Sequence, residues 1–152
     1  MRADSQVAVI VSQQIELSEI AELASCNDQQ FSDIINLCFS EYAPQQTSVE
    51  LCLMNEKEHC AAHQRFLNDP SATDVMAFSY DDDCCGELLV NVEMALRRAP
   101  EFPHGPVHEL LLYVVHGTLH LLGFDDHQPR DIENMRAAEQ NILQQAIKTN
   151  IF

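Results

Sequence analysis

The amino-acid sequence predicts an α+β fold, in which a small mixed β-sheet is surrounded by helices and one helix is buried. Three observations support this prediction. The 152 residues are enough for a single domain, 1–152, with a substantial core, but not for two domains. Stretches with strand and helix periodicity are interleaved, although not in a strict β-α-β order. One predicted helix is apolar on almost every side, which is typical of a helix inside a core.

The first half of the chain predicts two strands and two helices in alternation. Residues 7–11 form a short apolar run that predicts a buried strand. Residues 28–41 carry apolar side chains at the spacing of one helical face. Residues 47–54 alternate between apolar and polar, which predicts a half-buried strand. Asn55 can cap the helix that we expect at 56–66.

The second half predicts two more strands, followed by helices. We expect strands at 75–80 and 87–92, and a short helix at about 92–99 that ends before a proline. The segment 108–123, with the sequence HELLLYVVHGTLHLLG, is the helix that is apolar nearly all round. A last helix begins near 129, where a proline and acidic residues suit a first turn.

Composition restricts the function classes. The chain has 24 acidic and 8 basic residues, a formal net charge of −16, which opposes non-specific binding to nucleic acid. The N-terminal segment resembles neither a signal peptide nor a membrane span, so we expect a cytoplasmic protein without a membrane partner. The six cysteines form no C-x-x-C pair and are expected to be reduced thiols, several of them filling the core.

Two histidines on the buried helix are the strongest candidates for chemistry. His116 and His120 are four residues apart, so their rings lie on one face and can bind one ion. Gly123 is placed to reverse the chain and to deliver a third ligand from the segment that follows. Three protein ligands and an open position are typical of a catalytic zinc ion. The alternative is a histidine pair satisfied by hydrogen bonds alone.

The third ligand has two candidates. His127 is favoured, because a zinc ion in an imidazole-rich site prefers nitrogen, but Asp126 is open as an alternative. The one that does not bind the ion is expected to support the ligands, and Asp125 is a candidate to orient a ring nitrogen.

Two other histidine pairs share the four-residue spacing and serve as an internal comparison. The pair His59 and His63 lies on a polar helix and is expected to face solvent. The pair His104 and His108 brackets Gly105-Pro106, which predicts a loop. Neither pair has the apolar surroundings that make His116 and His120 stand out.

The spacing of the two histidines is also that of zinc peptidases, in which a glutamate follows the first histidine and acts as general base. This chain has Gly117 at that position. Because glycine cannot accept a proton, peptidase chemistry of that kind lacks its base. The small residue can instead allow the substrate or a strand to approach closely.

Three segments together resemble the YbeY family of bacterial endoribonucleases, which act in ribosomal RNA maturation and quality control. They have the sequences HGTLHLLGFDDH, RFLNDPSATDVMAFSY and GELLVNVEMA, and the resemblance covers about residues 47 to 145. It implies a mixed four-stranded sheet, a zinc-type ion on three histidines and hydrolysis of RNA. Two positions depart from the family pattern. Asp126 stands where the family usually has its third histidine, and Leu67 stands where it often has an arginine, with Arg65 two residues earlier.

Residues and resemblance together predict a metal-dependent endoribonuclease specific for single strands, with one Zn²⁺ and with His116 and His120 at its catalytic centre. Ribosomal RNA is the expected substrate, and the small ribosomal subunit or its proteins are the expected partners. Arg65, Arg97 and Arg98 are candidates to contact RNA, or else are solvated surface charges. The competing hypotheses are a zinc peptidase-like hydrolase and a non-catalytic, ribosome-associated protein stabilised by its metal.

Overall fold

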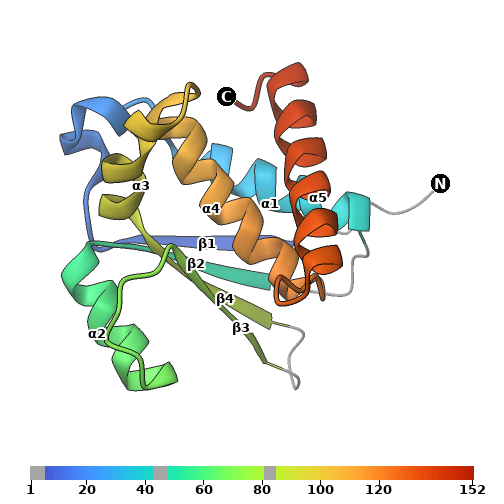
Figure 1. Cartoon of the computed structure of the whole chain (residues 1–152). Helices are drawn as coiled ribbons and strands as arrows, with labels where there is room; N and C mark the ends of the chain where they lie inside the picture. The colour runs from blue at the N-terminus through green and yellow to red at the C-terminus, as the bar shows by residue number, and fades with distance from the viewer. Residues whose placement is uncertain (1–5, 43–47, 81–84) are drawn as a thin grey trace.

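A four-stranded mixed sheet forms the centre of the molecule (Figure 1). The computed structural model describes residues 6–42, 48–80 and 85–152. The strands lie in the order β1-β2-β4-β3; β1, β2 and β4 are parallel, and β3 is antiparallel to β4. Their bounds are β1 Ala8–Gln13, β2 Ser48–Met54, β3 Val75–Tyr80 and β4 Cys85–Asn91. The mixed sheet predicted from the sequence is confirmed.

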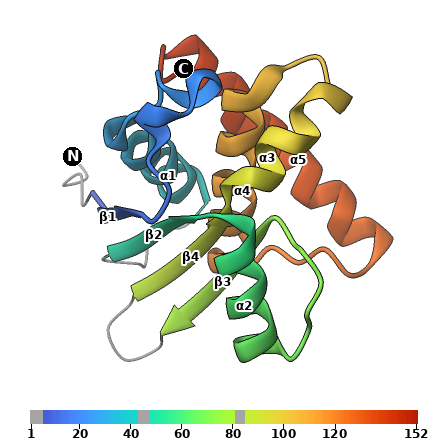
Figure 2. The same cartoon turned by 90° about the vertical axis from the view of Figure 1, so that its left-hand side faces the viewer.

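Helices cover both faces of this sheet. Figure 2 shows α1, α3, α4 and α5 on one face and α2 on the other. The helices are α1 (Asp28–Tyr42), α2 (Glu56–Leu67), α3 (Val92–Arg98), α4 (Gly105–Leu121) and α5 (Pro129–Lys148), with short 3-10 turns at Leu17–Glu19, Ala21–Leu23 and Ala99–Glu101. All five expected helices and all four expected strands are present. No helix in the described ranges is long and apolar enough to cross a membrane.

The apolar patterns of the sequence place the expected side chains in the core. On α1 the buried residues are Phe31, Ile34, Ile35, Cys38 and Phe39. On β2 the alternation buries Val49, Leu51 and Leu53. Asn55 caps α2 as expected, because its side chain accepts a hydrogen bond of 2.8 Å from the backbone N–H of Glu58.

α4 lies directly against the sheet because two glycines allow close contact. A Cβ atom on Gly117 would lie 2.8 Å from Cγ2 of Val75 and 2.9 Å from Cδ2 of Leu88. A Cβ atom on Gly86 would lie 2.6 Å from Cδ1 of Leu121. Real Cβ atoms do not approach so closely. From the sequence, the small residue at 117 could allow either the substrate or a strand to approach closely. In the structure it allows side chains of β3 and β4 to approach α4.

The two comparison pairs of histidines differ from the sequence-based prediction. His59 and His63 were expected to face solvent, but both are buried. Nε2 of His59 lies 2.8 Å from the carbonyl oxygen of Leu89, and Nδ1 of His63 lies 2.8 Å from that of Ser71. The first turn of α2 is charged, so only the contacts with Leu89 and Ser71 reveal that these imidazoles face inward.

The pair His104 and His108 also departs from the prediction. Gly105 and Pro106 were expected to form a loop, but α4 begins at Gly105. His104 is the residue before the helix, and its ring stacks on that of His108 with centroids 4.0 Å apart. Pro106 fits at the start of the helix, where its missing N–H has no partner to lose.

Four of the cysteines are described as free thiols. Cys26 and Cys38 are buried, and Cys52 and Cys60 are half-buried. The prediction of core-filling thiols is therefore confirmed for the first two. Cys84 and the side chain of Cys85 lie outside the described part of the chain.

Candidate metal centre

His116 and His120 face each other on the last turns of α4. Their Nε2 atoms are 3.1 Å apart, their ring centroids are 4.6 Å apart, and their planes are nearly perpendicular. Both side chains are partly buried, with exposed fractions of 20% and 28%. The rings therefore lie on one face of the helix, as their spacing predicts.

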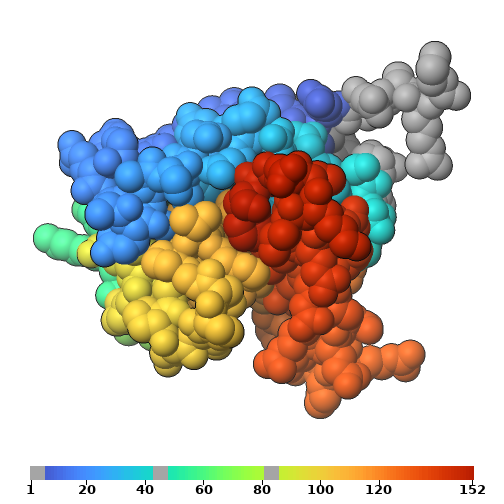
Figure 3. Space-filling view, turned by 90° about the horizontal axis from the view of Figure 1, so that it is seen from above, coloured from blue at the N-terminus to red at the C-terminus, as the bar shows by residue number. Residues whose placement is uncertain are grey.

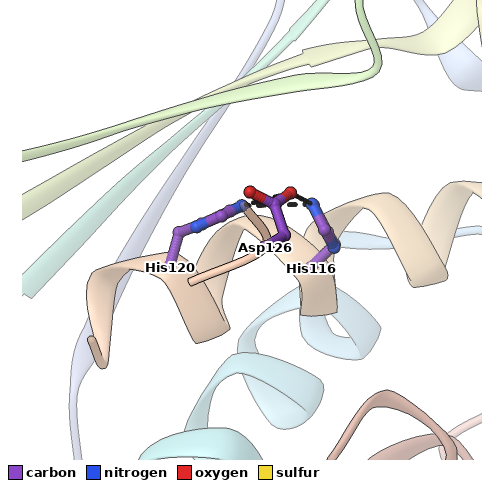
Figure 4. Close-up of side chains that lie close together, drawn as sticks. All are labelled: His116, His120 and Asp126. Atoms are coloured by element: carbon purple, nitrogen blue, oxygen red, sulfur yellow. Dashed lines mark hydrogen bonds and ion pairs between the residues drawn. The ribbon is translucent and has the colours of Figure 1, made fainter. Parts of the chain in front are cut away.

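The turn after α4 brings a carboxylate to the two imidazoles. Gly123 adopts a φ of +95°, a left-handed conformation that glycine adopts without strain. Around it, the N–H of Gly123 donates to the carbonyl of His120, and the N–H of Phe124 donates to that of Leu119. The chain then returns so that Oδ2 of Asp126 lies 3.4 Å from Nε2 of both histidines (Figure 4).

The three ligand atoms form a nearly equilateral triangle that fits a small divalent ion. The sides are 3.1 Å between the two nitrogens and 3.4 Å from each nitrogen to the carboxylate oxygen. A tetrahedral zinc ion with bonds of about 2.0–2.1 Å separates its ligand atoms by about 3.3 Å. The donor set of two imidazoles and one carboxylate is one that catalytic zinc sites use.

Hydrogen bonds fix which nitrogen of each ring faces the centre. Nδ1 of His116 lies 2.7 Å from Oε1 of Glu139 on α5, and Nδ1 of His120 lies 3.1 Å from the carbonyl oxygen of Phe124. Because both oxygens only accept, both Nδ1 atoms carry the proton and donate. Each Nε2 then presents its lone pair to the other. Two lone pairs at 3.1 Å need a shared proton or a cation between them, so the arrangement is suited to an ion.

The electrostatic environment of the centre is negative. Burial alone lowers the pKa of His116, but the hydrogen bond to Glu139 and the charges of Asp74, Glu139 and Asp126 outweigh it. The pKa of His116 is therefore raised above its ordinary value. The same negative charges that favour a proton on His116 favour a divalent cation.

Asp125 and His127, on either side of Asp126 in the chain, are more exposed than Asp126. His127 has an exposed fraction of 80%, and its Nε2 lies 3.4 Å from Oδ1 of Asp125. Asp125 also accepts a hydrogen bond from the backbone N–H of Asp126. A second group, Asp125, Asp126 and His127, has ligand atoms within 4.8 Å of one another, but it lies mostly at the exposed surface. The structure thus groups Asp126, rather than the favoured His127, with His116 and His120.

The three arginines proposed for RNA contact have other partners. Arg97 makes two hydrogen bonds to the carboxylate of Glu56, at 2.8 and 2.9 Å. Arg98 pairs with Glu101 at 3.2 Å, and the guanidinium of Arg65 lies 4.8 Å from the ring centroid of Phe66. None of these contacts joins an arginine to the two histidines or to Asp126, so a role in RNA contact stays a prediction.

Glu139 is the residue of the centre that sequence reasoning missed. The signal for it is present in the sequence. Met135 and Ile142 belong to the buried face of α5, and Glu139 lies four residues after the first and three before the second. An acidic residue within an apolar stripe requires a polar partner, and the histidine of the neighbouring helix provides it.

Comparison with known proteins identifies the family. A family model described as Endoribonuclease YbeY matches residues 12–147. The Endoribonuclease YbeY of Finegoldia magna is 28% identical over 141 residues, which cover 86% of this chain and 92% of the relative. That of Heliobacterium modesticaldum is 32% identical over 124 residues, covering 70% of this chain and 75% of the relative.

Two further comparisons agree. The Endoribonuclease YbeY of Rhodopirellula baltica is 44% identical over 82 residues, 51% of this chain and 42% of the relative. A Thermotoga maritima protein of known solution structure shares the fold, with a TM-score of 0.55 and 21% identity, covering 95% of this chain and 94% of that one. The chain belongs to the endoribonuclease YbeY family, which supports a role as a nuclease that hydrolyses RNA.

Proposed function

We propose that this protein is a metal-dependent endoribonuclease specific for single strands, with one Zn²⁺ held by His116, His120 and Asp126. The observation that carries the proposal is the triangle of two imidazole nitrogens and one carboxylate oxygen, with sides of 3.1 to 3.4 Å. Its biological role in this proposal is maturation of small-subunit ribosomal RNA and ribosome quality control in the cytoplasm. Family membership supports that role.

The residues around the centre have distinct tasks in this proposal. A divalent ion bound there supplies Lewis acidity toward a phosphoryl oxygen and toward water, so that no separate strong base is required. Glu139 and the carbonyl of Phe124 hold the two rings with their lone pairs inward. Gly117 leaves no space for a glutamate, because Val75 and Leu88 occupy the volume beside it. This contact argues against the zinc peptidase alternative.

The charge of the protein supports a role for a partner in substrate binding. With 24 acidic and 8 basic residues, the chain has few cations to offer to RNA phosphates. In this proposal the small ribosomal subunit, or one of its proteins, presents the RNA to the enzyme.

Three variants test the proposal. Wild-type protein, His116→Ala, Asp126→Ala and His127→Ala are purified, their zinc content is measured by elemental analysis, and single-turnover cleavage of a single-stranded RNA is followed. We expect His116→Ala and Asp126→Ala to lose zinc and cleavage, and His127→Ala to keep both. Full cleavage by a metal-free His116→Ala variant would exclude a metal-dependent mechanism. Loss of zinc in His127→Ala but not in Asp126→Ala would assign the third ligand to His127.

A further inference from the structure

The strand β3 has an open edge beside the metal centre. It is the last strand of the sheet and pairs with β4 alone among the described residues. Figure 2 shows it at the end of the sheet opposite β1. An open edge presents backbone N–H and C=O groups that no neighbouring strand uses.

The pairing register determines which groups point outward. The N–H of Asn91 donates to the carbonyl of Asp74 at 2.9 Å, so these two residues form a hydrogen-bonded pair. Hydrogen-bonded and non-hydrogen-bonded pairs alternate along an antiparallel ladder. Met76 and Phe78 therefore direct their backbone groups toward β4. The residues between and beside them, Val75, Ala77 and Ser79, direct theirs to the open edge.

Two of the three outward N–H groups are available. The N–H of Val75 donates to the side chain of Asp74 at 2.8 Å. Within the described part of the chain, no hydrogen bond outside the ladder reaches the N–H of Ala77 or Ser79. Because they are two residues apart in a strand, these N–H groups are about 6.6–6.8 Å apart and point in the same direction.

These N–H groups lie alongside the turn of α4 that carries the histidines. Gly117, between His116 and His120 in the chain, packs on Val75. One turn later, Leu121 packs on Gly86, which lies opposite Ser79 in the ladder. The helix segment with the two imidazoles thus packs on residues 75–79 of β3 and their partners in β4. Figure 4 shows strands of the sheet on the side of α4 to which the three side chains point.

The charge distribution determines what kind of donor can hold an RNA strand here. The surroundings of the centre are acidic, with Asp74, Asp126 and Glu139 acting on His116. Arg97 and Arg98 are engaged with glutamates. Backbone N–H groups can donate to phosphate oxygens without a side-chain cation, and a hydrogen bond to an anion is stronger than a neutral one.

We propose that the open edge of β3 is a subsite for the RNA backbone, in which the N–H groups of Ala77 and Ser79 donate to phosphoryl oxygens next to the cleaved linkage. The proposal rests on the endoribonuclease function proposed above. The occupant is an extended single strand, because the two donors form a straight row along an open edge.

Nuclear magnetic resonance of the ¹⁵N-labelled, zinc-loaded protein tests the subsite directly. The probe is a short single-stranded oligonucleotide with 2′-O-methyl riboses. We expect the amide protons of Ala77 and Ser79 to move downfield on titration. Those of Met76 and Phe78, already bonded to β4, are an internal control and are expected to move at most half as far. Unmoved amides at 77 and 79 while the probe binds elsewhere would overturn the proposal.

A pair of variants at one position separates backbone from side chain. Ser79→Ala keeps the N–H and serves as the reference for Ser79→Pro, because it removes only the side-chain hydroxyl. Ser79→Pro removes the N–H at an edge position that tolerates proline, and is expected to raise KM about tenfold with a smaller effect on kcat. Equal KM values in both variants, with melting temperatures like that of the wild type, would overturn the proposal.

The outcomes distinguish this subsite from the proposed function. If RNA is cleaved while the amides at 77 and 79 stay unmoved, the nuclease function stands and the subsite fails. If the probe does not bind and single-stranded RNA is not cleaved, both fail. If an extended peptide, but not the oligonucleotide, shifts these amides, the edge is a peptide site and the RNA subsite is excluded.

Discussion

At the scale of single residues, the centre depends on how each imidazole is oriented. Glu139 accepts a hydrogen bond from Nδ1 of His116, and a backbone carbonyl does the same for His120. Such partners fix the tautomer and increase the basicity of the ligand nitrogen. The carboxylate adds a negative charge that the carbonyl does not. We therefore expect the two histidines to depend differently on their surroundings, with His116 the more sensitive.

Replacement of Glu139 tests this dependence. Glu139→Gln keeps the size of the side chain but removes its charge, so we expect zinc affinity to fall about 10–100-fold. Competition with a chromophoric chelator measures the change. Glu133→Gln, an exposed position on the same helix, is the matched control and should leave affinity unchanged. An unchanged affinity in Glu139→Gln would show that the hydrogen bond does not support the ligand.

His59 gives a prediction about pH. Burial lowers the pKa of His59 below the ordinary value of 6.5, although its bond to Leu89 and nearby negative charges act in the opposite direction. Below about pH 6.5 the unfolded chain therefore takes up a proton that the folded chain does not. We expect the free energy of unfolding to fall as pH decreases through this window, by at most about 1.4 kcal/mol per pH unit from this group.

The His59→Gln variant isolates that contribution. Glutamine can still donate to the carbonyl of Leu89 but does not titrate. Urea unfolding between pH 5 and 7.5 should show a shallower loss of stability in His59→Gln than in the wild type. Parallel curves for the two proteins would mean that His59 has the same pKa in the folded and unfolded states.

At the scale of secondary-structure elements, the sequence predicted the order and type of the five α-helices and four strands of the described residues, but not the three short 3-10 turns. Apolar patterns were sufficient there: α1 has one apolar face, β2 alternates, and α4 is apolar on almost every side and is buried. Periodicity failed for His59 and His63, because their helix is polar by composition and the partners that bury them, Leu89 and Ser71, are distant in the sequence. It could not choose between Asp126 and His127, because the conformation of the turn at Gly123 decides which side chain returns to α4.

The contact between α4 and the sheet can be tested at Gly117. Alanine raises helix propensity by about 1 kcal/mol, but its Cβ would be within 3 Å of Val75 and Leu88, and overpacking costs about 1–3 kcal/mol. We expect Gly117→Ala to lower the free energy of unfolding in the wild-type background. In a Val75→Ala background, where the space is relieved, the same change should be neutral or stabilising. Stabilisation by Gly117→Ala alone would contradict the close contact.

At the scale of the whole molecule, the hydrophobic core does not pass through the metal centre. The buried side chains of α1, α4, α5 and the sheet face beneath them form one cluster, whereas the two histidines and Asp126 are only partly buried. The core should therefore stay folded without the ion. This expectation separates a catalytic metal from one that only holds the domain together.

Metal removal measures that separation. Zinc at about 100 times its dissociation constant should stabilise the protein by about 2.7 kcal/mol, which corresponds to a rise in Tm of about 5–10 °C. We expect calorimetry of the chelated protein to show a cooperative transition at lower temperature, and His116→Ala to have no zinc-dependent shift. A chelated protein that is unfolded at 25 °C would favour the non-catalytic, metal-stabilised alternative.

The bond between Glu139 and His116 also orders events during synthesis. Translation produces both imidazoles of α4 before it produces Asp126, and Glu139 follows thirteen positions after that aspartate. A nascent chain whose α5 is still within the ribosome thus has the histidines but not the carboxylate that steers His116. His116 gains this partner only when α5 has emerged and docked on α4, so an incomplete polypeptide lacks the hydrogen bond that orients His116.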